Sequence, residues 1–377
     1  MMIYLDYASH TPASDIVLEA FCQAERQFIG NPMSTHIAGH MAQQELAQIT
    51  QGIADLLYVK PQEIIFTSGA SEANNLAIKG IAGAYGYQGR HILSTCLEHP
   101  SVSGALAALQ ETGYEIELLR ILSDGTIDLE HLESAIRPDT LLVCISTVDS
   151  EIGAIQPVAN IAKILAKHTN CHLHVDAAQA MGKLPVHMAG ISTLCFSPHK
   201  FYGLCGSGVL IKKEGIVLQP QINGGKSASI YRGGTPALGL AAACYKALAL
   251  ALAQQDKWLA KIAFLREYVL KNLAEYPLVR INSPAAGSPY ILNLSIKGVR
   301  AAVFTSELSK HGVCVSIKSA CSADNTPSRP VMAVSKDKQN ALSSWRISFS
   351  HKTETSELDM FLSAFHKCYT LHTAKPG

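Results

Sequence analysis

The chain has 377 residues, of which 48% are hydrophobic and 16% charged, so it can bury a large core and is not a disordered chain. Lysine and arginine number 31 against 30 aspartates and glutamates, and no basic block interrupts the sequence. The net charge of +1 therefore argues against nucleic acid or an acidic membrane surface as the main partner.

The ten cysteines contain no C-x-x-C pair and follow no regular spacing. This pattern argues against a secreted disulfide scaffold and favours a reducing compartment. The first residues have neither the basic nor the apolar segment of a signal peptide. The most apolar long stretch, 236–253, is mostly alanine and leucine and contains Lys246, which disfavours insertion into a membrane. We expect a soluble, cytoplasmic protein.

From about residue 63 to residue 212, segments with a strand-like hydrophobic pattern alternate with segments that have the hydrophobic period of a helix. Short β-rich runs are separated by helical patterns, which predicts a mainly parallel sheet covered by helices. The expected strands are 64–67, 91–95, 115–119, 141–146, 172–175, 193–197 and 209–212, and the expected helices are 71–84, 102–111, 129–136 and 158–168.

The pattern changes after Pro236. Two long helices are expected, followed by a smaller α+β set. The helices are 237–255 and 258–274, the later strands are 290–296, 313–317 and 346–349, and further helices begin at 301 and 353. We therefore predict an α/β protein with a large domain over 15–256 and a small domain formed by 1–14 and 257–377.

Polar residues occur where three of these predicted strands end. In TSGASE (67–72) a turn leads into a helix, whose first N–H groups and dipole can bind an anion. Asp176 follows one strand, and Lys200 follows another in the segment SPHK (197–200). Because functional groups of open α/β sheets collect at the carboxyl ends of the strands, we expect these three features to lie together.

An anion site, a carboxylate and a lysine are the groups that pyridoxal 5'-phosphate requires. A lysine in a dry pocket loses its proton more easily and can form a Schiff base with an aldehyde. Each feature alone has a simpler explanation, such as a helix cap or a surface lysine, and only the combination favours the cofactor. Neither a Rossmann fingerprint nor a P-loop is present.

We expect no metal site. Cys171, His172, His174 and Asp176 could supply ligands, but successive strand residues point to opposite faces. His36 and His40 lie four residues apart without a third ligand.

Short motifs occur in a fixed order along nearly the whole chain. They are YLDY (4–7), TP (11–12), NP (31–32), TSGASEANNLAIKG (67–80), EH (98–99), EIG (151–153), HVDAAQ (174–179), GKLP (182–185), SPHK (197–200), RGGT (232–235), SAC (319–321) and WRISF (345–349). In this order they resemble the motifs of the class V (fold type I) pyridoxal-phosphate enzymes of the NifS/IscS-like cysteine desulfurase group.

The resemblance implies the fold and the cofactor. The fold would be a type I pyridoxal-phosphate-dependent transferase, with a mainly parallel seven-stranded sheet between helices and a smaller α+β domain. Lys200 would bind pyridoxal 5'-phosphate covalently, Asp176 would pair with its ring nitrogen, and His99 would stack on the ring. The remaining cofactor contacts would be Gln179 and Ser150 at the phenolic oxygen, and Ala70, Ser71, Ser197, His199 and a neighbouring subunit's Thr235 at the phosphate, which implies a homodimer.

The resemblance also implies the reaction. L-cysteine would be converted to L-alanine, with Lys200, His99 and Cys321 as the catalytic residues. The sulfur would pass to Cys321 as a persulfide and then to an acceptor protein. Arg346 would bind the substrate carboxylate through its planar guanidinium, with Ser150 and His36 as further substrate contacts.

Some positions depart from the family pattern. Asp149 and Ser150 stand before EIG where the family has two asparagines, and Lys226 follows the glycine pair at 224–225. Such departures are typical of a divergent member. Three alternatives therefore stay open: a lyase for selenocysteine or cysteine sulfinate, a class V aminotransferase or epimerase for another amino acid, and a sulfur carrier or scaffold without turnover. Nothing in the sequence selects among iron–sulfur cluster assembly, tRNA thiolation and DNA phosphorothioation as the pathway.

Overall fold

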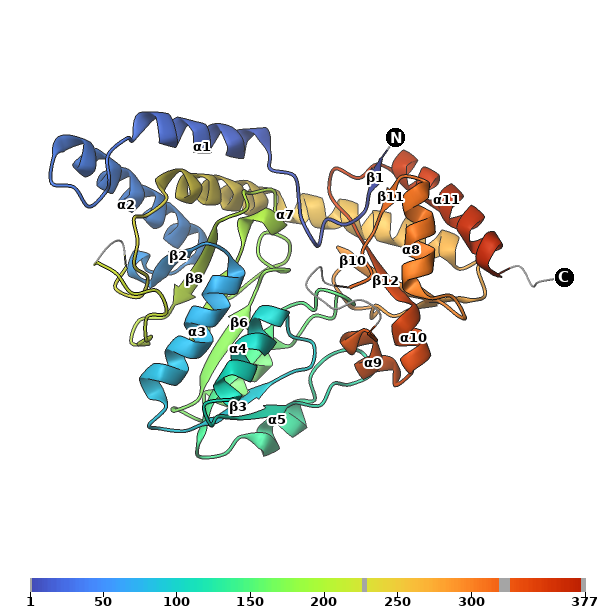
Figure 1. Cartoon of the computed structure of the whole chain (residues 1–377), viewed down its shortest axis with the longest axis horizontal. Helices are drawn as coiled ribbons and strands as arrows, with labels where there is room; N and C mark the ends of the chain where they lie inside the picture. Colours follow the sequence, from blue (N-terminus) through green and yellow to red (C-terminus); the bar gives the residue numbers. More distant parts are fainter. Residues whose placement is uncertain (1, 226–228, 319–325, 374–377) are drawn as a thin grey trace.

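The computed structural model describes residues 2–225, 229–318 and 326–373 (Figure 1). In this part of the chain, a seven-stranded sheet has the order β2-β8-β7-β6-β5-β3-β4. Its strands are β2 Ile64–Thr67, β3 His91–Ser94, β4 Glu115–Leu118, β5 Thr140–Ser146, β6 His172–Asp176, β7 Thr193–Phe196 and β8 Gly208–Lys212. Only β8 runs antiparallel to its two neighbours, so the predicted mainly parallel α/β sheet is confirmed.

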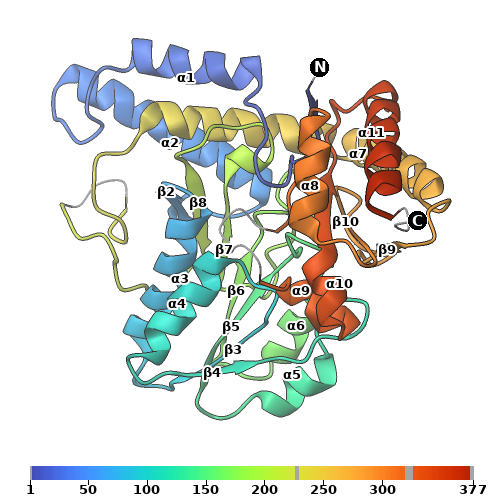
Figure 2. The ribbon, with the colours of Figure 1, turned by 45° about the vertical axis from the view of Figure 1, so that its right-hand side comes forward.

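Helices cover both faces of this sheet, since its central strands are buried throughout. On one face α3 (Ala70–Tyr85) and α4 (Pro100–Gln110) lie side by side (Figure 2) and pack against Leu142 and Cys144 of β5. The alternate side chains of β5, Val143 and Ile145, belong to the core on the opposite face. That core includes α6 (Val158–Leu165) and α7 (Leu238–Leu273), and α5 (Leu129–Ala135) lies against α6.

The register of the central strands brings their carboxyl ends to one edge. Ser146 of β5 lies beside Asp176 of β6, and Asp176 lies beside Cys195 of β7. The loops that follow these strands, together with the start of α3, therefore open toward the same space.

The smaller sheets join the two ends of the chain. β1 (Ile3–Tyr4) pairs in parallel with β11 (Val313–Cys314), which is shorter than the predicted strand at 313–317. A second, antiparallel sheet has the order β12-β10-β9. Its strands are β9 Val279–Ile281, β10 Ile291–Ile296 and β12 Ser344–Ser348, and the helices around it are α8 Ala301–Lys310, α9 Arg329–Ser335, α10 Lys338–Ser343 and α11 Thr355–Thr373.

One long helix replaces the two helices predicted at 237–255 and 258–274. The prediction was wrong because no glycine or proline separates the two segments, and the residues between them are compatible with a helix. α7 runs unbroken for 36 residues and contacts α1 (Asp15–Gln27), α2 (Ile37–Leu57) and α11. The predicted division at residue 256 falls inside this helix, and the two-domain organisation stays a prediction. Within the described ranges, no helix has an apolar stretch that would span a bilayer.

Candidate active site

A cavity of about 400 Å³ lies at the carboxyl ends of β5, β6 and β7. Its walls come from these strand ends, the first turn of α3, the N-terminal segment and β12. The predicted site residues that line it are Ala70, Ser71, His99, Ser150, Asp176, Gln179, Ser197, His199, Lys200 and Arg346. The structure thus brings most of the predicted residues into one space, although their roles stay predictions.

The start of α3 forms one end of the cavity. Its first backbone N–H groups have no partner within the helix, and Ser197 Oγ lies 2.9 Å from His199 Nδ1 beside them. A Cβ atom on Gly69 would lie 3.9 Å from Ser197 Oγ, within this concave region. A Cβ atom on Gly208 would lie 2.5 Å from the Gly69 carbonyl carbon, so glycine is required for β8 to run this close. The resulting cradle of donors suits a phosphate group.

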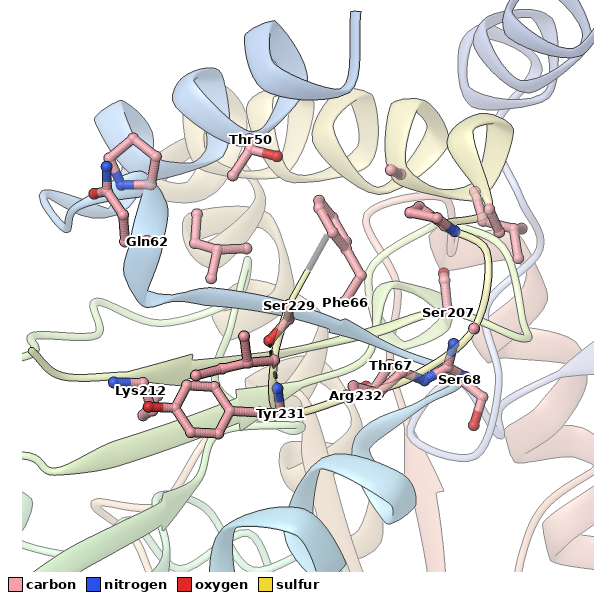
Figure 3. A pocket seen from close by; sticks show the side chains of 18 of the residues that line it. Thr50, Gln62, Phe66, Thr67, Ser68, Ser207, Lys212, Ser229, Tyr231 and Arg232 are labelled. Atoms are coloured by element: carbon pink, nitrogen blue, oxygen red, sulfur yellow. Dashed lines mark hydrogen bonds between the residues drawn. The ribbon is translucent and has the colours of Figure 1, made fainter. Parts of the chain in front are cut away.

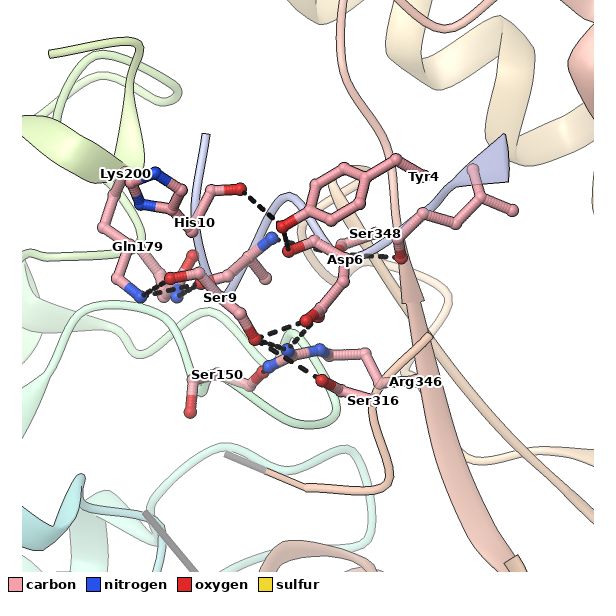
Figure 4. Close-up of polar contacts among 12 residues, drawn as sticks. Tyr4, Asp6, Ser9, His10, Ser150, Gln179, Lys200, Ser316, Arg346 and Ser348 are labelled. Atoms are coloured by element: carbon pink, nitrogen blue, oxygen red, sulfur yellow. Dashed lines mark hydrogen bonds and ion pairs between the residues drawn. The ribbon is translucent and has the colours of Figure 1, made fainter. Parts of the chain in front are cut away.

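Lys200 ends a short 3-10 helix, Pro198–Lys200, directly after β7. Its ammonium group donates to the carbonyl oxygens of Ala8 and Ser9, at 2.9 and 2.6 Å (Figure 4). Burial, and then the nearby charge of Arg346, lower the pKa of Lys200 to about 8. A substantial fraction of this amine is therefore neutral in mildly alkaline solution, which is the form that reacts with an aldehyde.

Asp176 is held in place by a buried hydrogen-bond network. Its carboxylate accepts from the Asn74 side chain and from the Ala178 amide, both at 2.9 Å. The Asn74 oxygen lies 2.8 Å from His174 Nε2, and burial lowers the pKa of His174 to about 4, so this imidazole is neutral at pH 7. The network orients the carboxylate toward a cation or N–H group in the cavity. Asn74 was not predicted as a site residue because helical asparagines carry no distinctive signal.

His99 and Gln179 are also fixed by local contacts. The His99 ring caps α4 by accepting from the Ser101 amide, and burial lowers its pKa, so it lines the cavity as a neutral imidazole. The Gln179 amide donates to the Ala8 carbonyl, the same oxygen that Lys200 contacts, and its oxygen accepts from Lys183. Lys183 is a buried lysine that was not predicted as a site residue, although it lies in the GKLP motif.

Arg346 projects from β12 and is 1% exposed. Its guanidinium donates to the Ser150 carbonyl at 2.6 Å and to Asp6 and Ser9 at 2.7 Å each (Figure 4). Its buried Nε has no hydrogen-bond partner among the described residues. Arg346 thus brings a buried positive charge, which the described residues do not fully pair, to the wall of the cavity, and Asp6 is a partner that the sequence did not identify.

Two predicted residues that the structure describes do not line this cavity, and a third falls outside the described ranges. His36 is exposed and caps α2 by accepting from the Gly39 amide at 3.2 Å, so its substrate role stays a prediction without support from this chain. Thr235 is exposed and was predicted to serve a neighbouring subunit, which a single chain does not test. Cys321 lies outside the described residues.

Asp149, the departure from the family pattern, faces into its own turn. One carboxylate oxygen accepts from the amides of Glu151 and Ile152, at 3.0 and 2.6 Å. The other oxygen is buried and lacks a partner in the described part of the chain. Burial, and then the charge of Glu151, raise the pKa of Asp149 to about 7. Since Ser150 and not Asp149 lines the cavity, this carboxylate does not face an anionic substrate.

The variant Asp149→Asn is expected to be more stable than the wild type at about pH 8. The raised pKa means that the contribution of Asp149 to stability is fully present below its unfolded pKa of about 4 and is lost as the pH rises through about 7. Asparagine keeps the accepting oxygen and removes the buried charge, for a gain of roughly 1–3 kcal/mol. Urea unfolding at about pH 4 and pH 8 measures this, and an equal effect at both values would contradict the titration of Asp149.

A second cavity of about 470 Å³ lies beside the sheet edge formed by β2 and β8 (Figure 3). Its lining includes Phe66, Lys212 and Tyr231, but neither Lys200 nor Asp176. Arg232 of the RGGT motif also lines it and pairs with Glu72 at 2.9 Å, and Glu72 itself lines the first cavity. This ion pair joins the loop after β8 to the first turn of α3.

Comparisons with known proteins agree with this geometry. Residues 3–361 match the family Aminotransferase class-V. A NifS/IcsS protein homolog of Lactobacillus delbrueckii subsp. bulgaricus is 36% identical over 98% of this chain and 97% of that protein. Cysteine desulfurase IscS of Dictyoglomus turgidum is 34% identical over 97% of this chain and 94% of that protein. Among solved structures, a NifS-like protein superposes with a TM-score of 0.92 at 29% identity, over 98% of this chain and all of the other. The structure of SspA in complex with cysteine superposes with a TM-score of 0.81 at 31% identity, over 93% of this chain and 99% of the other. The chain therefore belongs to the class-V aminotransferase family and is related to the cysteine desulfurases.

Proposed function

We propose that this protein is a pyridoxal-phosphate-dependent cysteine desulfurase, which converts L-cysteine to L-alanine and transfers the sulfur to a thiol of its own chain. The observation that carries the proposal is one cavity that combines an anion cradle with Asp176, Lys200 and Arg346. The relatives described as cysteine desulfurases, and the complex of SspA with cysteine, support cysteine as the substrate.

The residues present fit the cofactor. The donors at Ala70, Ser71, Ser197 and His199 would hold its phosphate, Asp176 its ring nitrogen and Lys200 its aldehyde carbon. When bound, the cofactor supplies an electron sink for negative charge that develops at the substrate α-carbon.

The side chains of the chain itself would carry out binding and proton transfer. Arg346 would bind the substrate carboxylate through its guanidinium, and this contact would place the α-carbon in the cavity that Lys200 also lines. Because the pKa of Lys200 is lowered to about 8, its amine can take a proton from the α-carbon and return it later. Neutral His99 packs at the wall of the cavity without adding a further positive charge.

Sulfur transfer requires a nucleophilic thiol. The thiolate attacks the substrate sulfur, an S–S bond forms, the Cβ–S bond breaks, and the carbon takes up a proton to become the methyl group of alanine. Cys321 is the proposed acceptor from the sequence. We further propose that the protein is a homodimer and that it is cytoplasmic, which the free state of the nine described cysteines supports. A separate protein would accept the sulfur, and iron–sulfur cluster assembly is one pathway that draws on it.

The proposal is tested by supplying purified, cofactor-loaded protein with L-cysteine and a reductant, and measuring alanine and sulfide. Equal amounts of both products are expected from the wild type. Most sulfide formation should be lost in Cys321→Ala, because that variant lacks the main acceptor. A loaded wild type that forms neither product would overturn the desulfurase assignment, and selenocysteine or cysteine sulfinate would then be supplied directly, with alanine as the readout.

A further inference from the structure

Cys205 differs from the other described cysteines in its surroundings. It is the only exposed one of the nine that the structure describes. It also lines the same cavity as Lys200, Asp176 and Arg346. Its neighbour Gly206 lines this cavity too, and a Cβ atom on Gly206 would meet nothing within 4 Å, so the turn at Cys205 borders open space.

A base lies beside this thiol. The Sγ atom of Cys205 is 3.6 Å from Nδ1 of His10, and the His10 ring stacks on that of His199 with centroids 5.7 Å apart. Cys205 also lies near enough to Lys200 to raise the pKa of that lysine, although burial and Arg346 lower the same pKa by more. The thiol therefore has an imidazole within reach that can accept its proton.

An independent feature indicates that a ligand binds in this cavity. Arg346 is buried, and its Nε has no partner within the described ranges, although the other guanidinium nitrogens bond to Ser150, Asp6 and Ser9. A buried cation with an unused donor suits a small carboxylate. An amino acid held there shares the cavity with Cys205.

We propose that Cys205 is a second sulfur-accepting residue, which takes the sulfur of L-cysteine directly in the cavity. This inference rests on the proposed function. The Cys205 thiol gives its proton to His10, and its thiolate attacks the substrate sulfur. An S–S bond forms while the Cβ–S bond breaks, the bonding electron pair stays on the carbon, and a proton completes the methyl group. Cysteine and one thiol thus give alanine and one persulfide, without an external oxidant or reductant.

The test uses cofactor-loaded Cys321→Ala protein, in which the other proposed acceptor is absent. One equivalent of L-cysteine is added without reductant, free thiols are alkylated, and the masses of the proteolytic peptides are measured by mass spectrometry. We expect one extra sulfur atom on the Cys205 peptide and alanine in matching amount. In Cys321→Ala/Cys205→Ser, this first-turnover alanine should fall at least about tenfold.

Two further variants serve as controls. Cys171→Ser should leave the result unchanged, since Cys171 lies outside the cavity and burial raises its pKa to about 12. His10→Ala should reduce the sulfur found on Cys205, because the thiol then lacks the imidazole that accepts its proton. Thermal unfolding checks that each variant is folded.

The outcomes separate the two proposals. Alanine from the wild type without extra sulfur on Cys205 in Cys321→Ala would overturn this inference alone, as would equal alanine from the single and double variants. No alanine from the wild type would overturn the proposed function, and this inference with it.

Discussion

Replacing Lys200 by alanine is expected to lower the rate of alanine formation from L-cysteine by roughly 10²- to 10⁴-fold or more. The amine lines the cavity, and burial together with Arg346 lowers its pKa to about 8, which suits a proton acceptor at the substrate α-carbon. The Ala8 carbonyl would keep its hydrogen bond from Gln179 in the variant, so the fold should persist. Alanine is measured with the cofactor in excess, so that a loss of cofactor affinity is not mistaken for a loss of catalysis.

The control for this experiment is Lys200→Arg. Arginine keeps the positive charge near the Ala8 and Ser9 carbonyls, but its guanidinium does not lose a proton in proteins. Both variants should therefore lose a similar share of the rate of alanine formation. An active Lys200→Arg enzyme would show that this position acts through its charge and not through proton transfer.

The second large effect is expected for Arg346→Lys, whose kcat/KM for L-cysteine should fall by about 10²-fold, mainly through KM. The guanidinium donates simultaneously to the Ser150 carbonyl, Asp6 and Ser9, and Arg346 lines the cavity in which a carboxylate would bind. A lysine keeps the charge beside Asp6, but its single nitrogen does not reproduce this planar set of donors.

Cysteamine, which is cysteine without its carboxylate, separates this role from a structural one. If Arg346 binds the substrate carboxylate, wild-type protein should bind L-cysteine far more tightly than cysteamine, and Arg346→Lys should lose most of that difference. An equal loss of affinity for both ligands would mean that the residue maintains the shape of the cavity and does not recognise the carboxylate.

The central sheet and much of the site were predictable because both depend on local patterns. Buried strands appear as short apolar runs, and all seven strands of the sheet, including the antiparallel β8 and the more exposed β4, were located from the sequence. Polar residues at the ends of such strands, such as Asp176 and Lys200, must then lie at one edge of the sheet.

The contacts made by the N-terminal segment were not predictable in the same way. Lys200 and Gln179 bond to the backbone carbonyl of Ala8, and every residue type offers such a carbonyl. Helix α1 and helix α2 were not predicted from the sequence, although α1 has an amphipathic helical pattern that could have identified it. Cys205 carried no motif, and its exposure, its place in the cavity and its contact with His10 emerge only from the structure.

The position of the first ten residues has a consequence for the order of folding. β1 pairs with β11, the Asp6 carboxylate pairs with Arg346, and the carbonyls of Ala8 and Ser9 hold Lys200. Residues more than 300 positions apart must therefore meet before the cavity has all its walls, and such distant contacts form slowly. During synthesis the seven-stranded sheet and Lys200 can form early, while the N-terminal segment lacks its partners in β11 and β12 until these strands have left the ribosome. The cavity can then hold its ligands only in a completed chain.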